Sequence, residues 1–365
     1  MRILLVAGSY PPMKCGVGDY TAALADGLVS LGHQVAVITS TAASERPSQE
    51  SARVFATISS WQRSEFAEFK RVVGEWKPDI IHLQLPTLGY GAGDLPWRLS
   101  YLAHALPVPL VQTWHELPAA RIDRRKAEWA MALSRGDVIV VRPAFREQLP
   151  RWFRWASAHK KYEYVPNAST IPRVQLSDAQ RRDLRARFGA ENRRLVAFFG
   201  FLYEHKGIDD LLQLLTAQRD RLVLIGEVKQ WDPYQVELVK RMAQPPYSEF
   251  VHLTGYLPGE DAGAILAAAD AIAMPYRQGG GSWNTSLHAA VMQGSFVLTT
   301  SYEQHGYDAA LNVYFARPGD VEDLRAGLDA HAGKRNTHPD AARQPPTWQE
   351  VAERHVEFYR RHLRR

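Results

Sequence analysis

Short hydrophobic stretches alternate with longer segments of mixed polarity along the first half of the chain. Apolar runs of about four to eight residues that end at polar or glycine positions are typical of buried parallel strands. Amphipathic helices are predicted at Thr21–Leu31 and Trp61–Trp76, between such runs. This order indicates βαβ units and a parallel sheet. The predicted strands lie at 2–7, 34–39, 79–83, 108–115, 137–141 and 162–167.

The second half repeats this arrangement without repeating its sequence. A polar, arginine-rich stretch at 172–192 predicts a linker and a first helix, and Pro345-Pro346 breaks the chain before an amphipathic helix at Trp348–Leu363. The second set of predicted strands lies at 195–200, 222–226, 250–255, 271–274 and 295–300. We therefore predict two doubly wound, Rossmann-like α/β domains at 1–170 and 171–344, and a C-terminal helix at 345–365 that crosses back to the first domain.

Composition agrees with two globular domains. The chain has 365 residues, of which 45% are hydrophobic and 23% charged, and this length exceeds what one ordinary core supports. The single cysteine, Cys15, excludes an internal disulfide framework and favours a cytoplasmic location. No apolar run reaches the roughly 20 residues of a membrane span. The net charge of +5 fits an anionic substrate or peripheral contact with the inner face of an anionic membrane, and we expect no nucleic-acid partner.

A glycine-rich loop at 275–285 is the first candidate site. Gly279, Gly280 and Gly281 follow the predicted strand at 271–274, and Ser282, Trp283, Asn284 and Thr285 precede a helix predicted at about 286–293. Glycines let the backbone approach a ligand closely, and a helix N-terminus attracts anions through its N–H groups and dipole. The loop therefore suits a diphosphate, although an ordinary strand-to-helix turn has the same composition.

A second glycine pair, Gly16 and Gly18, precedes the helix predicted at Thr21–Leu31. Dinucleotide-binding proteins carry a third glycine where this chain has Thr21, and an acidic residue at the end of the second strand, where this chain has Thr39-Ser-Thr41. A nicotinamide dehydrogenase is therefore not favoured. The two glycines can still face a diphosphate.

His115 ends the strand predicted at 108–115. Ligands of open α/β sheets lie at the carboxyl ends of the strands, so this histidine is a site candidate, although a lone histidine is often structural. No cluster of histidine, cysteine and aspartate has the spacing of a metal site, and we expect no metal and no cofactor.

A basic, aromatic segment at Phe145–Lys161 suggests a surface for anionic lipid. Its aromatic side chains, Phe145, Trp152, Phe153 and Trp155, are interleaved with arginines and lysines at 146, 151, 154, 160 and 161. The alternative is a solvated basic helix that packs its aromatic side chains inward.

These motifs, in this order, resemble glycosyltransferase family four, the retaining nucleotide-sugar enzymes of the GT-B fold. The motifs include Phe-Gly-Phe-Leu-Tyr-Glu-His-Lys-Gly207, Leu-Ile-Gly226 and Thr-Gly-Tyr-Leu-Pro258. The resemblance implies two Rossmann-like domains that face a cleft, with Gly16 and Gly18 beside the donor diphosphate and His115 near the transferred sugar. It further implies that Lys206 pairs with the phosphates, that Glu227 faces the nucleotide, that Tyr256 and Leu257 hold the base, and that the Gly280–Asn284 loop takes sugar and diphosphate.

The chain departs from the family pattern at the site. Phe201 stands where the family has an arginine, and Gly281 and Ala289 stand where it has two glutamates. One glutamate usually holds donor ribose hydroxyls and the other contacts the sugar. We expect the hydroxyl and amide groups of Ser282, Asn284, Thr285 and Ser286 to replace them.

The resulting expectation is a cytoplasmic, metal-independent, retaining glycosyltransferase with His115 and Lys206 in catalytic roles. It would move a sugar from a nucleoside diphosphate sugar to a hydroxyl of a glycan or lipid-linked acceptor, in glycan, polysaccharide or glycolipid synthesis. Two alternatives stay open: a non-catalytic nucleotide-sugar-binding protein of the same fold, and a GT-B phosphorylase, for which the sequence shows no pyridoxal lysine site.

Overall fold

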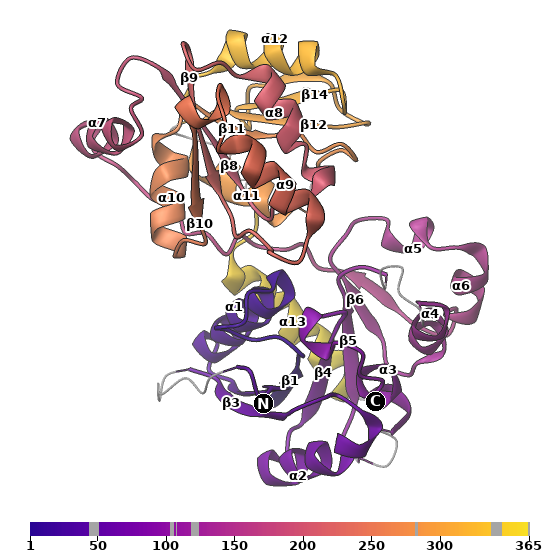
Figure 1. The fold of residues 1–365 in the computed structure, drawn as a ribbon. Coiled ribbons are helices and arrows are strands. Elements are labelled where there is room, and N and C mark those ends of the chain that lie inside the picture. Colours follow the sequence, from indigo (N-terminus) through magenta and orange to yellow (C-terminus); the bar gives the residue numbers. More distant parts are fainter. Residues whose placement is uncertain are drawn as a thin grey trace. The chain divides into compact units, whose positions relative to one another are not determined.

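The computed structural model describes residues 1–43, 51–102, 106, 108–117, 124–281, 284–336 and 345–363. It divides into two compact units, which are described separately (Figure 1). Unit 1 comprises residues 1–168 together with 346–365, and unit 2 comprises residues 169–345. None of the described helices has the length and hydrophobicity needed to span a bilayer.

Unit 1 is built on a seven-stranded parallel sheet with the order β3-β2-β1-β4-β5-β6-β7. Side chains of β1 alternate between two hydrophobic cores, because successive residues of a strand point to opposite faces. Ile3 and Leu5 lie in one core, and Leu4 and Val6 lie in the other. The strands are β1 (Arg2–Val6), β2 (Gln34–Ser40), β3 (Arg53–Ile58), β4 (Ile80–Leu85), β5 (Leu110–Trp114), β6 (Val138–Val140) and β7 (Tyr162–Tyr164).

Helices cover both faces of this sheet. Side chains of α1 and α13 contribute to the core that contains Ile3, and side chains of α2, α3, α4 and α6 contribute to the core that contains Leu4. The helices are α1 (Gly16–Ser30), α2 (Phe66–Trp76), α3 (Leu95–Leu102), α4 (Arg124–Leu133), α5 (Phe145–Gln148), α6 (Arg151–Ala156) and α13 (Trp348–Leu363).

The distant helix α13 completes unit 1. It packs along α1, and Figure 1 shows the yellow helix beside the indigo one. A Cβ atom at Gly27 of α1 would lie 2.9 Å from the Trp348 carbonyl oxygen and 3.1 Å from the Ala352 Cβ, so only glycine permits this approach. Val351, Ala352 and Tyr359 are fully buried, which makes α13 part of the core of unit 1.

Unit 2 contains a second seven-stranded sheet, with the order β10-β9-β8-β11-β12-β14-β13. Its neighbouring strands are parallel except for β13 and β14, which pair antiparallel. The strands are β8 (Arg194–Phe199), β9 (Asp220–Ile225), β10 (Val251–Gly255), β11 (Ala271–Met274), β12 (Val297–Thr300), β13 (Gly306–Asp308) and β14 (Val313–Ala316). The helices are α7 (Asp178–Arg187), α8 (Ile208–Leu214), α9 (Pro233–Met242), α10 (Gly259–Ala268), α11 (Thr285–Met292) and α12 (Val321–His331).

The predicted fold class, two doubly wound Rossmann-like sheets, is confirmed. One helix boundary was wrong in a way that affects the site. The helix expected to start at Thr21 starts at Gly16, so Gly16 and Gly18 lie in its first turn rather than ahead of it. Glycines lower helix propensity, but the close packing of Gly18 against Ser9 outweighs that local preference.

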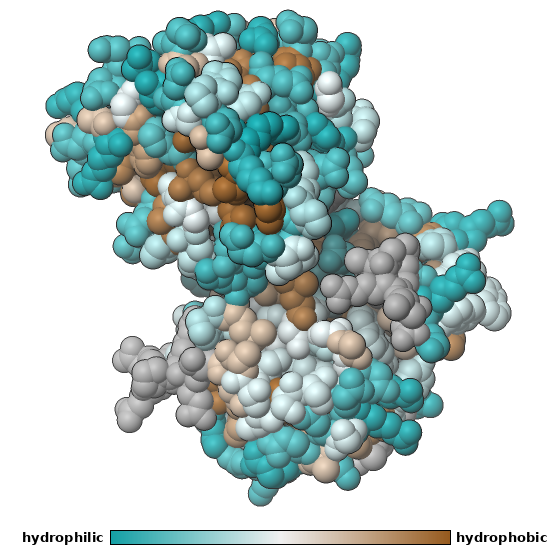
Figure 2. All heavy atoms as spheres, in the orientation of Figure 1, coloured by the Kyte–Doolittle hydropathy of each residue, from teal (hydrophilic) through white to brown (hydrophobic). Residues whose placement is uncertain are grey.

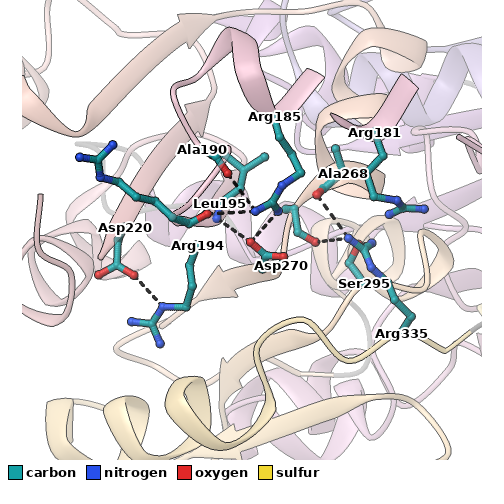
Figure 3. A network of polar contacts seen from close by, with 12 residues as sticks. Arg181, Arg185, Ala190, Arg194, Leu195, Asp220, Ala268, Asp270, Ser295 and Arg335 are labelled. Carbon is teal, nitrogen blue, oxygen red and sulfur yellow. Dashed lines mark hydrogen bonds and ion pairs between the residues drawn. The ribbon is translucent and has the colours of Figure 1, made fainter. Parts of the chain in front are cut away.

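Charged side chains at the amino ends of the unit 2 strands have a structural role (Figure 3). Asp270 accepts from the Arg185 guanidinium at 2.6 Å and from the Leu195 backbone N–H at 2.8 Å. Arg335 donates to the carbonyl oxygens of Ala267, Ala268 and Ala269, where α10 ends. Cations near a helix C-terminus satisfy its last carbonyl groups, so this cluster stabilises the sheet edge opposite the candidate site.

The edge strand β10 lies beside the most hydrophobic part of the visible surface of unit 2. Figure 2 shows brown residues gathered in the region of α10 and β10. Leu253 of β10 is 37% exposed.

Candidate functional site

The predicted site residues follow the carboxyl ends of parallel strands in both units. In each sheet the strand order reverses beside a central strand, β1 in unit 1 and β8 in unit 2, and such reversal points are where open α/β sheets bind ligands. The segment containing Lys206 follows β8, Glu227 follows β9, Tyr256 and Leu257 follow β10, and the glycine-rich loop follows β11. Gly16 and Gly18 follow β1, and His115 follows β5.

In unit 2 the segment after β8 is held against the loop after β11. The Lys206 ammonium lies 4.4 Å from the centroid of the buried Tyr276 ring, and the Arg277 backbone N–H donates to the His205 carbonyl at 2.9 Å. Gly207 has a φ of +75°, and a Cβ there would lie 2.0 Å from the Pro275 carbonyl oxygen. A glycine is therefore required for the two segments to meet and to place Lys206 at the loop.

Ionised groups surround this junction. Arg277 donates to Asp210 at 3.0 Å, and that contact raises the pKa of the guanidinium. Burial alone would raise the pKa of Asp209, but hydrogen bonds from Arg241 and from the Tyr234 hydroxyl outweigh burial and lower it. Asp209 and Arg277 are thus held in their charged forms.

Glu227 belongs to the same cluster of segments. A Cβ at Gly226 would lie 2.1 Å from the Gly200 carbonyl oxygen, so the ends of β8 and β9 are in close contact. The Glu227 carboxylate accepts from Lys229 at 2.8 Å. Lys229 and Arg277 were not predicted from the sequence. Their spacing carries no motif, because their positions depend on contacts between separate loops.

The segment after β10 lies next to Glu227. The Gly226 N–H donates to the Gly255 carbonyl at 3.1 Å, which places Tyr256 beside this loop. The Tyr256 side chain is 57% exposed, whereas Leu257 is half-buried and packs against the core of unit 2. Their predicted contact with a nucleotide base stays a prediction.

The glycine-rich loop differs from the expected array of exposed N–H groups. The Gly279 N–H donates to the Tyr276 carbonyl at 3.0 Å, and the Gly280 N–H donates to the Thr300 carbonyl at 2.7 Å. These two groups are therefore engaged within the protein and are not offered to a phosphate. Gly280 is tightly enclosed, since a Cβ there would lie 2.8 Å from the Thr299 hydroxyl.

The remaining loop positions divide into three kinds. Asn284 caps α11, since its side-chain oxygen accepts from the Ser286 N–H at 2.9 Å, and Thr285 is the first residue of that helix. Gly281 is half-buried, and Ala289 is buried in the core of unit 2. Ser282 and Trp283 lie outside the described residues, so their predicted donor contacts stay predictions.

In unit 1 the first turn of α1 begins directly at the predicted glycine pair. A Cβ at Gly18 would lie 3.1 Å from the backbone of Ser9, whereas Gly16 has open space around it. The first N–H groups of a helix have no partner within the helix, so this turn can present donors to an anion. Asp19 lies in the same turn, and burial raises its pKa to about 6.

His115 is held by contacts on two sides. Its Nε2 lies 2.9 Å from Oε1 of Gln84, and its ring meets the Tyr20 ring edge-on with centroids 4.7 Å apart. Burial is the main cause that lowers the pKa of His115 to about 3, and the charges of His355 and Arg142 contribute to this shift. The imidazole is therefore neutral at physiological pH.

Two more neutral histidines lie behind His115. His82 contacts the Tyr359 hydroxyl at 2.6 Å and the Thr113 hydroxyl at 2.7 Å, and Gln84 joins it to His115. Nδ1 of His355 donates to a carbonyl oxygen, that of Val351, at 2.7 Å. Burial lowers the pKa of His355 to about 4, so its Nε2 must accept from the Tyr20 hydroxyl, 3.2 Å away.

This network links residues far apart in the sequence. Tyr20 and His355 are 335 positions apart, and His82 and Tyr359 are 277 apart, so no local pattern could have revealed these contacts. Among the residues that the structure describes, no group of three or more histidine, cysteine, aspartate or glutamate side chains is arranged to hold a metal ion.

Two surface hollows do not coincide with the predicted site residues. One, of about 480 Å³, lies at the structural arginine cluster of unit 2. The other, of about 460 Å³, is lined by Arg146, Glu147, Arg151, Arg154 and Trp155 of unit 1. The candidate site is therefore defined by strand ends and loop contacts rather than by a single hollow.

Comparison with known proteins identifies the family. A model of glycosyltransferase family 4 matches residues 15–168, and a model of group 1 glycosyl transferases matches residues 193–331. The chain belongs to glycosyltransferase family four. Each of the two models falls within one structural unit of this glycosyltransferase.

Curated relatives are distant. A 2-deoxystreptamine glucosyltransferase of Streptomyces kanamyceticus is 22% identical over 231 residues, which are 59% of this chain and 58% of that protein. A GDP-mannose-dependent alpha-mannosyltransferase of Mycolicibacterium smegmatis is 25% identical over 305 residues, 75% of this chain and 73% of that protein. The first match thus spans less than two thirds of the relative's length.

Solved structures share the fold over nearly the whole chain. Sucrose-phosphate synthase from Thermosynechococcus elongatus has a TM-score of 0.69 at 16% identity, with 99% of this chain and 98% of that chain covered. Anabaena HepE in complex with UDP-glucose has a TM-score of 0.68 at 16% identity, with 100% and 98% covered. The fold is therefore GT-B.

Proposed function

We propose that this glycosyltransferase moves a sugar from a nucleoside diphosphate sugar to an acceptor hydroxyl, with retention of configuration at the transferred carbon. The observation that carries the proposal is the charged strand edge of unit 2, where Lys206 is held against the loop after β11 by Gly207 and Tyr276. The matched mannosyltransferase is named for its use of GDP-mannose, and HepE was solved with UDP-glucose, which supports a donor of this class.

The chemistry asks the protein to stabilise negative charge on the departing diphosphate. An ammonium in a partly desolvated position stabilises such charge without reorganising during the reaction. We assign this role to Lys206 and to the first turn of α1 at Gly16 and Gly18. These groups need no metal, so we propose metal-independent transfer. Retention rests on the family resemblance, since no pair of carboxylates in the sequence points to a double displacement.

Unit 1 supplies neutral hydrogen-bonding groups in this proposal. The neutral imidazole of His115 has both a donor and an acceptor nitrogen, which suits a hydroxyl of the transferred sugar. Asp19, with a pKa of about 6, is poised to exchange a proton near neutral pH. Both roles are distinct from the charge stabilisation assigned to Lys206.

We also propose that the acceptor is glycan or lipid-linked, and that unit 1 contacts anionic lipid. Trp155 of α6 is 78% exposed and shares a hollow with Arg146, Arg151 and Arg154. Basic residues beside an exposed tryptophan suit an anionic interface. Lys160 does not belong to this surface, because it is buried and its ammonium donates to the carbonyl and hydroxyl oxygens of Ser134.

Transfer and hydrolysis assays with UDP-, GDP- and ADP-sugars test the proposed function. We expect turnover of one donor in the presence of a chelator, with the anomeric configuration of the product determined by NMR. Tight binding of a sugar nucleotide without hydrolysis or transfer to any glycan or lipid-linked acceptor would favour the non-catalytic binding protein. Activity that a chelator abolishes and a divalent cation restores would overturn the metal-independent step.

A further inference from the structure

Lys229 lies at the same strand edge as Lys206, two positions after Glu227, and the family resemblance gives it no role. It follows β9, and its ammonium lies 5.5 Å from the centroid of the Phe201 ring. Phe201 follows β8 after one intervening residue, Gly200, and lies five positions before Lys206. The structure therefore places a positive charge against the aromatic ring that occupies the position of the family's arginine.

The surroundings of Lys229 hold this charge in place. The side chain is 15% exposed, and the ammonium pairs with Glu227, itself 25% exposed, at 2.8 Å. The Lys229 backbone N–H donates to Gln235 at 2.8 Å, and Gln235 donates in turn to Asp232, the capping residue of α9. A lysine fixed at both its backbone and its ammonium loses less conformational entropy on binding a ligand than a free surface lysine does.

Arg277, another cation at this strand edge, is less able than Lys229 to bind a ligand. Arg277 already faces Asp210 at 3.0 Å, Asp209 at 3.8 Å and Glu204 at 4.0 Å, so carboxylates surround it. Among the residues that the structure describes, Lys229 forms an ion pair with one carboxylate, that of Glu227. An ammonium has three donor hydrogens, so Lys229 can keep Glu227 and still donate to a phosphate oxygen.

We propose that Lys229 is a second diphosphate ligand of the donor site, which takes over the charge that an arginine at position 201 would have supplied. The proposal rests on the proposed function, because it assumes a nucleoside diphosphate donor. A diphosphate carries more than one negative charge, and Lys206 alone balances only one of them. Glu227 orients the Lys229 ammonium and stabilises its positive charge when no donor is bound.

Calorimetry with Lys229→Met provides the test, because methionine keeps the apolar stem on Phe201 and removes the charge. Ligands are UDP, GDP and ADP, together with the matching nucleosides without phosphate. We expect affinity for the bound nucleoside diphosphate to fall about tenfold to a hundredfold, as for loss of a hydrogen bond to a charged group. Nucleoside affinity should be unchanged, and Lys229→Arg should restore most of the loss.

The controls separate this inference from its alternatives. Lys240→Met, at an exposed lysine of α9, makes the same charge change and should leave affinity unchanged. Unaltered diphosphate affinity of Lys229→Met, beside a loss in Lys206→Met, overturns the role of Lys229 alone. An equal loss for nucleoside and nucleoside diphosphate also overturns it, because Lys229 would then act by positioning Glu227. A wild-type protein that binds none of the three nucleotides overturns the proposed function as well.

Discussion

The two units present chemically opposite groups at equivalent edges of similar sheets. In unit 1, burial shifts His82, His115 and His355 toward their neutral forms, and it shifts Asp19 the same way. In unit 2, the corresponding edge holds Lys206 over the Tyr276 ring, and Lys229 and Arg277 beside carboxylates. The common topology thus does not determine the electrostatics of the edge, which depend on the loops.

This contrast suits the two parts of a nucleotide-sugar reaction. Sugar hydroxyls require directional donors and acceptors, which neutral imidazole and amide groups provide. A diphosphate requires positive charge, and the ammonium groups of unit 2 provide it. A family member with the charge and the neutral groups exchanged between its units would contradict this division.

Acidification should have the largest effect on the difference between the two units, because it protonates the neutral histidines of unit 1. The pKa of His115 is about 3 and that of His355 about 4 in the folded protein, below the ordinary 6.5, so the unfolded chain binds more protons below about pH 6.5. Their stabilising contribution is present above that pH and is lost as the pH falls. Between its folded and unfolded pKa values, each such histidine changes the free energy of unfolding by about 1.4 kcal/mol per pH unit. The raised pKa of Asp19 has the opposite effect on stability, but it is one group against the three histidines His82, His115 and His355.

Denaturant unfolding at pH 7 and pH 5 measures this slope. We expect the free energy of unfolding to fall by several kcal/mol on acidification, and His82→Gln to reduce the slope by about one histidine's share. Equal stability of the wild type at both pH values would show that the histidines are not neutral in the folded protein.

Removing the charge of Lys206 should have the next largest effect. Lys206→Ala is expected to weaken nucleoside diphosphate binding by about 1.5–3 kcal/mol, because a charge-assisted contact is lost. Calorimetry measures this loss, and Lys240→Ala on α9 is the matched control. An unchanged affinity in Lys206→Ala, with an unchanged melting temperature, would remove Lys206 from the donor site.

The basic surface of unit 1 should respond to charge removal on membranes. Arg151→Gln combined with Arg154→Gln is expected to weaken binding to phosphatidylserine vesicles by about 1 kcal/mol for each arginine. Cosedimentation at low ionic strength measures the binding, and Arg182→Gln with Arg187→Gln, at exposed positions of α7, is the control. Absence of wild-type binding at low salt would reject the lipid surface.

Asn284 provides the smallest and most selective test. Asn284→Ala should cost about 1 kcal/mol of stability, since the side chain caps α11. Asn284→Ser keeps a capping oxygen and lacks the amide. If Asn284 also holds donor hydroxyls, both variants bind sugar nucleotide more weakly but bare nucleotide normally. Full sugar-nucleotide affinity in Asn284→Ser would leave Asn284 with the capping role alone.

Hydrophobic periodicity predicted the fold class because the central strands of both sheets are continuous apolar runs. It did not predict β3 or α9, and it placed the start of α1 five residues too late. The strand β3 has a mixed burial pattern, and the glycines at the start of α1 favour a loop when considered locally. In both places tertiary packing decides the structure.

The individual site segments could be found from sequence, but their partners could not. His115 ends a strand that periodicity predicts, whereas Lys206 was named through the family resemblance. Gln84 of β4 and Lys229 of the loop after β9 depend on contacts with residues of other segments, and their residue types carry no signal. Gly279 and Gly280 show the reverse case. Their motif predicted backbone N–H groups exposed to a phosphate, but these groups donate to backbone carbonyls of unit 2.

The packing of α13 on α1 has a consequence for synthesis on the ribosome. Residues 169–345, which form unit 2, emerge between the two parts of unit 1. The α1 surface around Gly27, where α13 packs, and the hydroxyl of Tyr20 therefore stay uncovered while an entire second unit is translated. Unit 1 is the first to begin synthesis and the last to be completed. During that interval the apolar surface of α1 is available to chaperones.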